Sequence, residues 1–312
     1  MKMRIGVPDL VSNSYFPAVA AATLGAFEEQ GLDIALELVS PLPDCIKALR
    51  DGTVHFVGAS AHAPLLAFPE WKGASLLCAQ SQGTYWLLVM RKDLAIARGD
   101  IATLAGMRIA AVPFVGAALK QILLEAGMDP VRDNIEIMMP EAAAKPGTNF
   151  GVAAAQALKE GTIDGFFANG MGAEMAVRHG TGSLVLDIRR GLGPKESFHY
   201  TLPAIATTDE LISEAPDVAA KVIRAVIKTQ KALKADIKLA TEVGTKLFPP
   251  LEAGLIANVV ERDLPYYDPI ISEAFVDTMN RYSRAVGLLK GQCAYDEVVA
   301  TRFRDEWDAG PK

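Results

Sequence analysis

The chain has 312 residues, of which 50% are hydrophobic and 22% are charged, and its formal net charge is −6. These values exclude a disordered chain, a collagen-like repeat and a disulfide-stapled miniprotein, and the acidic balance argues against broad binding to nucleic acid. A single core becomes unfavourable beyond about 250–300 residues, so the length predicts two lobes.

The cysteines and the first residues bear on the compartment. Cys45, Cys78 and Cys293 are far apart and form no Cys-x-x-Cys pair, so we expect packing residues, with no disulfide framework and no zinc ligand set. No apolar run reaches the roughly 18–20 residues that span a bilayer. Residues 1–7 lack the pattern of a secretory signal. We therefore expect a cytoplasmic chain, or one whose leader is not in this sequence.

The first part of the chain alternates apolar runs with amphipathic segments. Pro17 suits the first position of a helix and Gly31 suits a left-handed C-cap, which predicts a helix between them. A second helix is expected to end at Gly52. The apolar runs are interpreted as buried parallel strands at Met3–Val7, Ile34–Val39 and Val54–Ala59.

The second hundred residues repeat this pattern. Ala48–Val54 is echoed by Ala157–Ile163, and the triplet Met3–Ile5 is echoed by Met107–Ile109. Strands are expected at 107–112, 135–139 and 163–168, with helices that end at Gly127 and Gly161. Alternation of strand and helix predicts an α/β fold of two small doubly wound lobes, each with a parallel sheet.

Two segments are expected to connect the lobes. Residues 86–94, with a strand candidate at 86–90, and residues 184–208 are interpreted as the crossings, and 191–196 as a hinge loop. From residue 209 onward the pattern is helical, and we expect this third to pack on the first lobe. The prediction is a monomer with lobe 1 formed by residues 1–88 and 196–312, and lobe 2 by residues 89–195.

Four loops follow predicted strands and lead into helices. In open α/β sheets, ligands bind outside the carboxyl ends of the strands, and helix starts favour anionic or strongly polar groups. The pattern therefore predicts a ligand cleft between the lobes. Its loops are Val11–Phe16, Ser60–Pro64, Pro113–Gly116 and Asn169–Gly172.

The candidate ligand-binding residues come from these loops and from the first crossing. The polar ones can instead cap helices, and Tyr85 can instead fill the core. The candidates are Ser12, Asn13, Ser14, Tyr15, Phe16, Ser60, His62, Tyr85, Pro113, Val115, Gly116, Asn169, Gly170 and Met171.

Catalytic patterns are weak. His62 has no acidic partner and no second histidine at metal-binding spacing, so ligand contact or structural hydrogen bonding is favoured over catalysis or metal binding. No phosphate loop, dinucleotide fingerprint or His-Glu-x-x-His motif is present. We expect no catalytic residue, no metal and no cofactor. The pair Arg189-Arg190 is either an anchor for an acidic ligand or a solvated surface pair, and the second interpretation is favoured.

Several of these segments resemble a known family. Ser14–Pro17 with Leu24–Ile34, then Ala48–Val54, then Asp164–Asn169, are similar to extracytoplasmic solute-binding proteins of ABC importers, in the branch for sulfonate, nitrate, taurine and thiamine precursors. The resemblance covers residues 3–305. It implies a type II periplasmic-binding-protein clamshell that closes on a small-molecule ligand, works outside the cytoplasm, and delivers the ligand to a membrane permease.

The same fold family includes enzymes. Resemblance to the thiamine-pyrimidine synthase implies a lysine four residues before His62, where this chain has Gly58. Resemblance to the aryl-sulfinate desulfinase implies a cysteine in the first loop, and Val11–Phe16 contains none. A receptor for a small organic anion or heterocycle is therefore the preferred function. The alternative is a cytoplasmic enzyme acting on a pyrimidine or sulfur compound.

Overall fold

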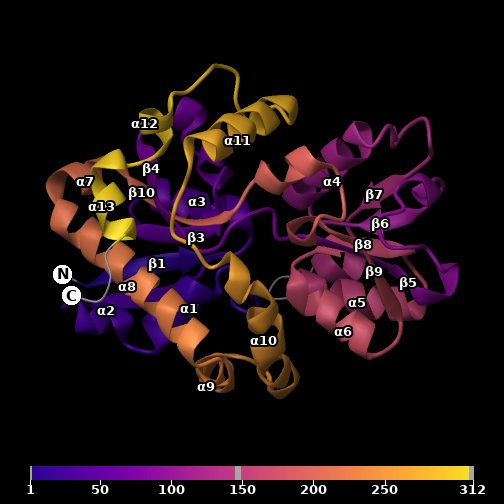
Figure 1. The fold of residues 1–312 in the computed structure, drawn as a ribbon, viewed down its shortest axis with the longest axis horizontal. Helices are drawn as coiled ribbons and strands as arrows, with labels where there is room; N and C mark the ends of the chain where they lie inside the picture. The colour runs from indigo at the N-terminus through magenta and orange to yellow at the C-terminus, as the bar shows by residue number, and fades with distance from the viewer. Residues whose placement is uncertain (1, 145–148, 309–312) are drawn as a thin grey trace. The chain divides into compact units, whose positions relative to one another are not determined.

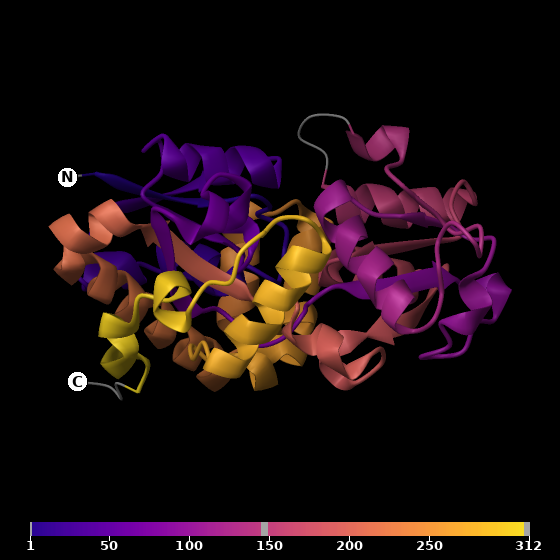
Figure 2. The ribbon, with the colours of Figure 1, turned by 90° about the horizontal axis from the view of Figure 1, so that it is seen from above.

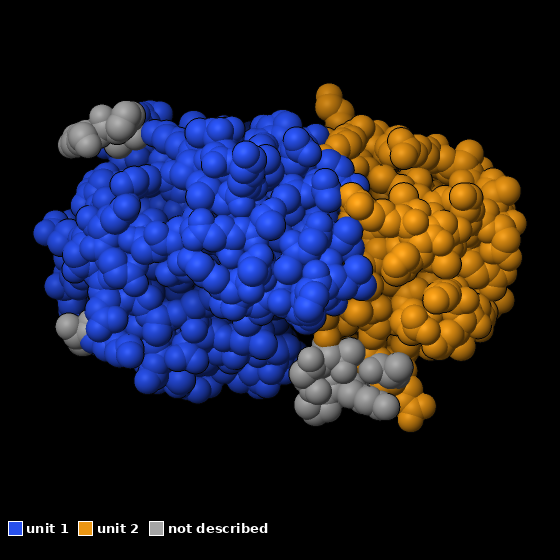
Figure 3. Space-filling model, turned by 90° about the horizontal axis from the view of Figure 1, so that it is seen from below, with its two compact units in different colours: residues 1–82, 201–312 blue, residues 83–200 orange. Residues whose placement is uncertain are grey.

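The computed structural model describes residues 2–144 and 149–308. The chain divides into unit 1, Met1–Gln82 with Thr201–Lys312, and unit 2, Gly83–Tyr200 (Figure 3). Each unit has its own five-stranded sheet with helices packed on it. The predicted α/β class with two lobes is confirmed.

The sheet of unit 1 has the strand order β2-β1-β3-β10-β4. Strands β2, β1 and β3 are parallel, as predicted, whereas β10 is antiparallel to both of its neighbours. The strands are β1 Met3–Val7, β2 Ile34–Leu38, β3 Phe56–Ser60, β4 Ala74–Ala79 and β10 Pro203–Thr208.

The sheet of unit 2 has the corresponding order β7-β6-β8-β5-β9, and β5 is antiparallel to both of its neighbours. Its strands are β5 Leu87–Arg91, β6 Arg108–Ala110, β7 Glu136–Met138, β8 Gly165–Ala168 and β9 Gly182–Asp187. In each unit the antiparallel strand is the first one formed after the chain enters that unit from the other. The expectation of purely parallel sheets was therefore wrong for one strand in each sheet.

Helices connect the strands and form the end of the chain (Figures 1 and 2). The single helix expected from Pro17 to Gly31 is two helices, because Gly25 adopts a left-handed conformation with a φ of 81°. The α-helices are α1 Phe16–Thr23, α2 Ala26–Glu29, α3 Leu42–Arg50, α4 Pro113–Glu125, α5 Phe150–Glu160, α6 Gly170–Arg178, α7 Asp209–Glu214, α8 Pro216–Ala235, α9 Lys238–Leu247, α10 Pro250–Asp263, α11 Glu273–Ala285, α12 Tyr295–Val298 and α13 Arg304–Trp307. Among the shorter 3-10 helices are η1 Ala63–Leu66 and η6 Ile188–Arg190.

The sequence repeat has a structural cause. Arg4 Nη1 donates to the carbonyl oxygen of Thr53 at 3.3 Å, and Arg108 Nη1 donates to that of Thr162 at 2.8 Å. The helix before each threonine is followed by a glycine with a φ of 72°, Gly52 and Gly161. The repeated residues therefore build the same corner of helix and strand once in each unit.

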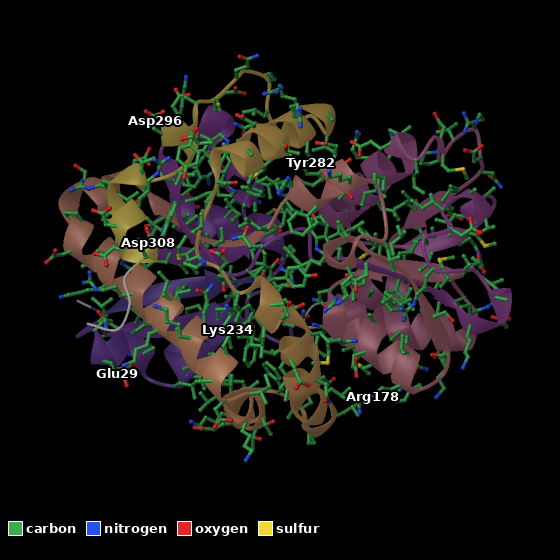
Figure 4. The ribbon with its side chains drawn as sticks, in the orientation of Figure 1. Glu29, Arg178, Lys234, Tyr282, Asp296 and Asp308 are labelled. Atoms are coloured by element: carbon green, nitrogen blue, oxygen red, sulfur yellow. The ribbon has the colours of Figure 1, made fainter. Side chains whose placement is uncertain are left out.

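The C-terminal helices pack on unit 1. Helix α8 lies against α1 and α2 (Figure 1), and Lys228 on α8 forms an ion pair of 2.6 Å with Glu29, which Figure 4 labels. Trp307 Nε1 donates to the carbonyl oxygen of Leu77 in β4 at 2.9 Å. The end of the chain thus covers unit 1. Within the two described ranges, no helix has the length and apolar character needed to cross a membrane.

Candidate ligand-binding site

The first two candidate loops lie at one edge of the unit 1 sheet. Strands β1 and β3 are parallel neighbours, with Ile5 opposite Phe56, so both strands end at the same edge. The segment before α1 follows β1, and Ala61 and His62 follow β3. This is the edge at which open α/β sheets bind ligands.

The polar residues before α1 are buried. Ser12, Asn13 and Ser14 are 0%, 4% and 1% exposed, and no side chain caps α1 at its N-cap residue. Instead, the amide of Ala18 donates to Oε1 of buried Gln80 at 3.0 Å. The capping interpretation of these serines is therefore wrong for α1.

Ser14 is the most informative of these residues. Its amide donates to Ser12 Oγ at 3.1 Å, which shapes the turn. Its own hydroxyl is buried and has no hydrogen-bond partner among the described residues. A buried hydroxyl without a partner is destabilising by about 1–3 kcal/mol. The Ser14 hydroxyl is therefore a candidate for a hydrogen bond to a ligand.

Asn13 is held by a residue that sequence reasoning missed. Its Nδ2 donates to Oδ2 of Asp263 at 2.5 Å, and Asp263, the last residue of α10, is 5% exposed. A carboxylate only accepts hydrogen bonds, which fixes the orientation of the Asn13 amide. The C-terminal helices therefore contribute directly to the shape of the first loop.

His62 is fully buried, and its ring is a neutral hydrogen-bonding group. Its Nδ1 lies 2.9 Å from Thr201 Oγ1, and its ring meets the edge of Tyr282 on α11, labelled in Figure 4, at 5.2 Å. Burial lowers the pKa of His62 to about 3. Thr201 is the residue at which the chain re-enters unit 1. Structural hydrogen bonding, one of the two favoured interpretations, is therefore present.

The remaining candidates in unit 1 are buried as well. Phe16 is 0% exposed, and its ring lies 6.4 Å from that of Phe248, so Phe16 packs in the interior of unit 1. Tyr15 is 7% exposed at the N-cap of α1, and Ser60, the last residue of β3, is 2% exposed.

The other candidate loops lie at one edge of the unit 2 sheet. Leu87, the first residue of β5, pairs with Ala168 on one side and with Asp187 on the other. The residues before β5 and after β8 and β9 therefore share an edge, and parallel β6 ends at this edge too. Tyr85 and Asn169 are among them.

The starts of α4 and α6, which lie at this edge, differ in burial and packing. Pro113 is exposed at the first position of α4 and Val115 is half-buried. The amide of Gly116 donates to the carbonyl oxygen of Val112 at 2.8 Å, and a Cβ at Gly116 would lie 3.1 Å from Ile137 Cγ2. Gly116 thus serves the close packing of α4 on β7. By contrast, Asn169 precedes α6 without capping it, and Gly170 and Met171 form its buried start.

Aromatic rings and an arginine gather around Tyr85. The rings of Tyr85 and Trp86 are 5.1 Å apart and both residues are nearly buried. Arg189 is only 7% exposed, and its Cζ lies 5.8 Å from the centre of the Tyr85 ring. Arg190 is exposed and pairs with Asp187 at 2.7 Å. The interpretation of a solvated pair was therefore wrong for Arg189.

Sequence reasoning missed Arg189 because the charge of two adjacent arginines suggests a surface. The signal that could have found it was its place two residues beyond Asp187, the end of a buried strand.

The buried cysteines and the possible metal ligands bear on the chemistry that the chain can perform. Burial raises the pKa of the Cys45 thiol to about 12 and also raises that of Cys78, so neither is poised to form the thiolate that a nucleophile requires. Both are packing residues, as predicted. Over the described ranges, no group of three His, Cys, Asp or Glu side chains could hold a metal ion.

A groove of about 650 Å³ lies elsewhere on unit 1. It is lined by the start of β1, by residues just before β2 and β3, and by α7 and α8, with Met3, Val54, Leu211 and Lys221 among its residues. These strand starts are at the edge opposite to the candidate loops. The groove is therefore separate from the predicted site.

Comparison with known proteins identifies the family. Residues 12–236 match the model of the family described as "NMT1/THI5 like". The chain belongs to the NMT1/THI5-like family. The comparison with curated protein sequences returned no match.

Solved structures share the fold of this NMT1/THI5-like protein. The alkanesulfonate-binding protein SsuA from Xanthomonas axonopodis pv. citri, bound to MOPS, has a TM-score of 0.69 and 17% identity, over 97% of each chain. The periplasmic nitrate-binding protein NrtA from Synechocystis PCC 6803 has a TM-score of 0.68 and 11% identity, over 98% of this chain and 87% of that one. The desulfurization enzyme DSZB has a TM-score of 0.65 and 15% identity, over 97% of each. At these identities the likeness concerns the fold, which binding proteins and an enzyme share.

Proposed function

We propose that this chain is a solute-binding receptor of an ABC-type importer, which captures a small organic anion or heterocycle. In this proposal the candidate loops of both units contact one ligand, and binding shifts a hinge equilibrium toward a closed state. The binding proteins for alkanesulfonate and nitrate among the structural relatives support this role.

The observation that carries the proposal is the first loop of unit 1. Three consecutive polar residues are buried there, they do not cap the helix that follows, and the Ser14 hydroxyl has no partner within the described chain. Ser12 and Asn13 make hydrogen bonds that shape this loop, and a buried hydroxyl without a partner, as at Ser14, is expected where a ligand supplies the missing hydrogen bond.

An enzymatic role is the second candidate, and the shared fold of the desulfurization enzyme DSZB is the observation that favours it. Two features argue against it. The loop of residues 11–16 contains no cysteine, and His62 has a pKa far below the neutral range in which a general base works best. We therefore prefer binding without turnover.

Partner and location follow from the receptor proposal. A receptor of this kind delivers its ligand to a membrane permease, works outside the cytoplasmic membrane, and is expected to be monomeric without binding nucleic acid. The periplasmic binding proteins among the relatives support the location.

Removing the Ser14 hydroxyl should weaken binding while leaving the fold intact. For Ser14→Ala we expect an unfolding free energy equal to that of the wild type or about 1 kcal/mol higher, because a buried unpaired hydroxyl is lost. Affinity should fall about 5- to 30-fold, the value of one or two hydrogen bonds. The wild type would first be titrated in a calorimeter with MOPS, nitrate, benzenesulfonate and biphenyl-2-sulfinate. The variant would then be titrated with the compound that the wild type binds most tightly.

Ser283→Ala is the matched control. Ser283 on α11 also has a fully buried hydroxyl without a partner among the described residues, but it lies in none of the four loops. Its replacement should raise stability to a similar extent and leave affinity unchanged. If Ser14→Ala and the wild type bind the ligand with equal affinity, the proposed contact between the Ser14 hydroxyl and the ligand is wrong.

A further inference from the structure

Gln80 caps helix α1 from a distant strand. The first turn of a helix leaves amides without a partner, and the side chain of the N-cap residue usually accepts from the second or third of them. In α1 the second helical residue is Pro17, which has no N–H, so the amide of Ala18 is the one that remains for such a cap. That amide donates to Oε1 of Gln80 at 3.0 Å, across 62 residues of chain. The capping acceptor of α1 therefore comes from outside the loop that precedes it.

Strand register puts Gln80 at the ligand edge of unit 1. Ala204 in β10 pairs with Ala59 in β3 and with Ala79, the last residue of β4. Gln80 follows Ala79, so it lies at the edge where β3 ends. Because β1 and β3 are parallel, the first candidate loop, Val11–Phe16, follows β1 at this edge too.

The Gln80 amide has one favourable orientation. Its Nε2 donates to the carbonyl oxygen of Ala204 at 3.2 Å, while its Oε1 accepts from Ala18. The two partners are a carbonyl and an N–H, so a flipped amide would face an acceptor with an acceptor and a donor with a donor. Gln80 is fully buried beside Gly58 of β3, where a Cβ would lie 3.1 Å from Gln80 Nε2 and 3.2 Å from the Cβ of Ala18. The glycine thus leaves room for Gln80 to reach α1.

This cap leaves the Ser14 hydroxyl without a structural task. The amide of Ser14 donates to Ser12 Oγ, which shapes the turn, and Gln80 caps the helix. The Ser14 hydroxyl is buried and has no hydrogen-bond partner among the described residues. Serines in front of a helix usually turn their hydroxyl toward its amides. A cap supplied from elsewhere therefore leaves this hydroxyl available.

We propose that Gln80 is a positioning residue of the ligand site, which keeps the Ser14 hydroxyl available for the ligand by capping α1. This inference rests on the proposed receptor function, and it adds a residue that acts on the ligand only through Ser14. Without Gln80 the amide of Ala18 needs another acceptor, and Ser14 is the nearest serine in the chain. Its hydroxyl then turns to the helix and is lost to the ligand.

A double-mutant cycle between Gln80 and Ser14 tests this role. Gln80→Met keeps the approximate size of the side chain but offers no oxygen, and we expect it to lower affinity about 5- to 30-fold, as Ser14→Ala does. The double variant should bind at most about twofold more weakly than Gln80→Met, because the hydroxyl that Ser14→Ala removes is already lost to the ligand. If Gln80 only stabilised the fold, the two losses would multiply to at least about 25-fold.

The probe is whichever of MOPS, nitrate, benzenesulfonate and biphenyl-2-sulfinate the wild type binds most tightly in titration calorimetry. Thermal unfolding of each variant verifies folding. If Gln80→Met does not fold, Gln80→Asn takes its place in the cycle, because it stays polar but is one methylene too short to reach α1.

Gln230→Met is the matched control. Gln230 on α8 is a second buried glutamine of unit 1, and its Nε2 donates to the carbonyl oxygens of Ala79 and Gln80 at 3.1 and 2.8 Å. These bonds hold the same strand end rather than the start of α1. Its replacement should lower the unfolding midpoint, as Gln80→Met does, and leave both the affinity and the effect of Ser14→Ala unchanged.

The outcomes separate this inference from the function on which it rests. Gln80 does not position Ser14 if the two losses multiply, if Gln80→Met or Ser14→Ala binds the probe as the wild type does, or if Gln230→Met loses as much affinity as Gln80→Met. In each of these cases the receptor function stands. If none of the four compounds binds the wild type, the receptor function is contradicted, and this inference with it.

Discussion

Replacing Gly172 by alanine is expected to destabilise unit 2 by about 3 kcal/mol or more, because the new methyl group has no space. A Cβ at Gly172 in α6 would lie 2.4 Å from the carbonyl oxygen of Gly151 in α5, and 2.7 and 2.8 Å from its C and Cα atoms. These are backbone atoms, so no change of rotamer relieves the overlap. The two helices must separate, and α6 starts at the candidate loop that begins with Asn169.

Hydrogen exchange with mass spectrometry can locate this effect. Gly172→Ala should lose protection in β6 and β8 of unit 2, while the strands of unit 1 keep theirs. Gly254→Ala is the matched control, because Gly254 lies in α10 and a Cβ there would meet no heavy atom within 4 Å. That change should stabilise the protein by about 0.5–1 kcal/mol. Wild-type protection in Gly172→Ala would show that α5 and α6 do not approach so closely.

The stability of the protein should decrease as the pH falls below about 6.5, and His62 should be the largest single histidine contribution. Burial lowers the pKa of His62 from its ordinary value of 6.5 to about 3. Between these values the unfolded chain binds a proton at this side chain and the folded chain does not. Each pH unit in that window therefore lowers the free energy of unfolding by up to about 1.4 kcal/mol, or about 2 kcal/mol at pH 5.

The variant His62→Asn separates this effect from packing. Asparagine can retain a hydrogen bond to Thr201 but does not titrate. We expect the variant to be less stable than the wild type at pH 8, and its stability to depend less on pH. Urea unfolding at pH 8 and pH 5 should show a difference about 2 kcal/mol smaller than in the wild type. Partly buried His55 and His199 have pKa values lowered in the same direction, and they account for part of the remaining slope. An identical pH dependence in the variant would exclude His62 as its source.

Much of the fold follows from local patterns, because the parallel strands and their helices have strong local signals. The corner repeated at Arg4 and Arg108 is visible as a repeat because the same side chain makes the same hydrogen bond in both units. The missed strands β4 and β10 have weak signals. Strand β4, Ala-Ser-Leu-Leu-Cys-Ala, has no β-branched residue, and β10 begins with proline.

The candidate site is predictable to a smaller extent. The loops after β1, β3, β6 and β8 follow from strand order, since parallel strands end at one edge. Asp263 is 250 residues from Asn13 and Thr201 is 139 residues from His62, so only the folded chain brings these partners together. The burial of Arg189 likewise depends on the tertiary position of η6, which the charge of the Arg189-Arg190 pair conceals.

Retention of an unchanged ligand tests the central claim most directly. The purified chain would be incubated with MOPS, nitrate, benzenesulfonate and biphenyl-2-sulfinate, separated from unbound compounds by gel filtration, and the retained molecules identified and quantified by mass spectrometry. The receptor function predicts that one compound is retained at close to one equivalent and is recovered chemically unchanged. Retention of none of them above the level of a control protein, or products in molar excess over the protein, would contradict it.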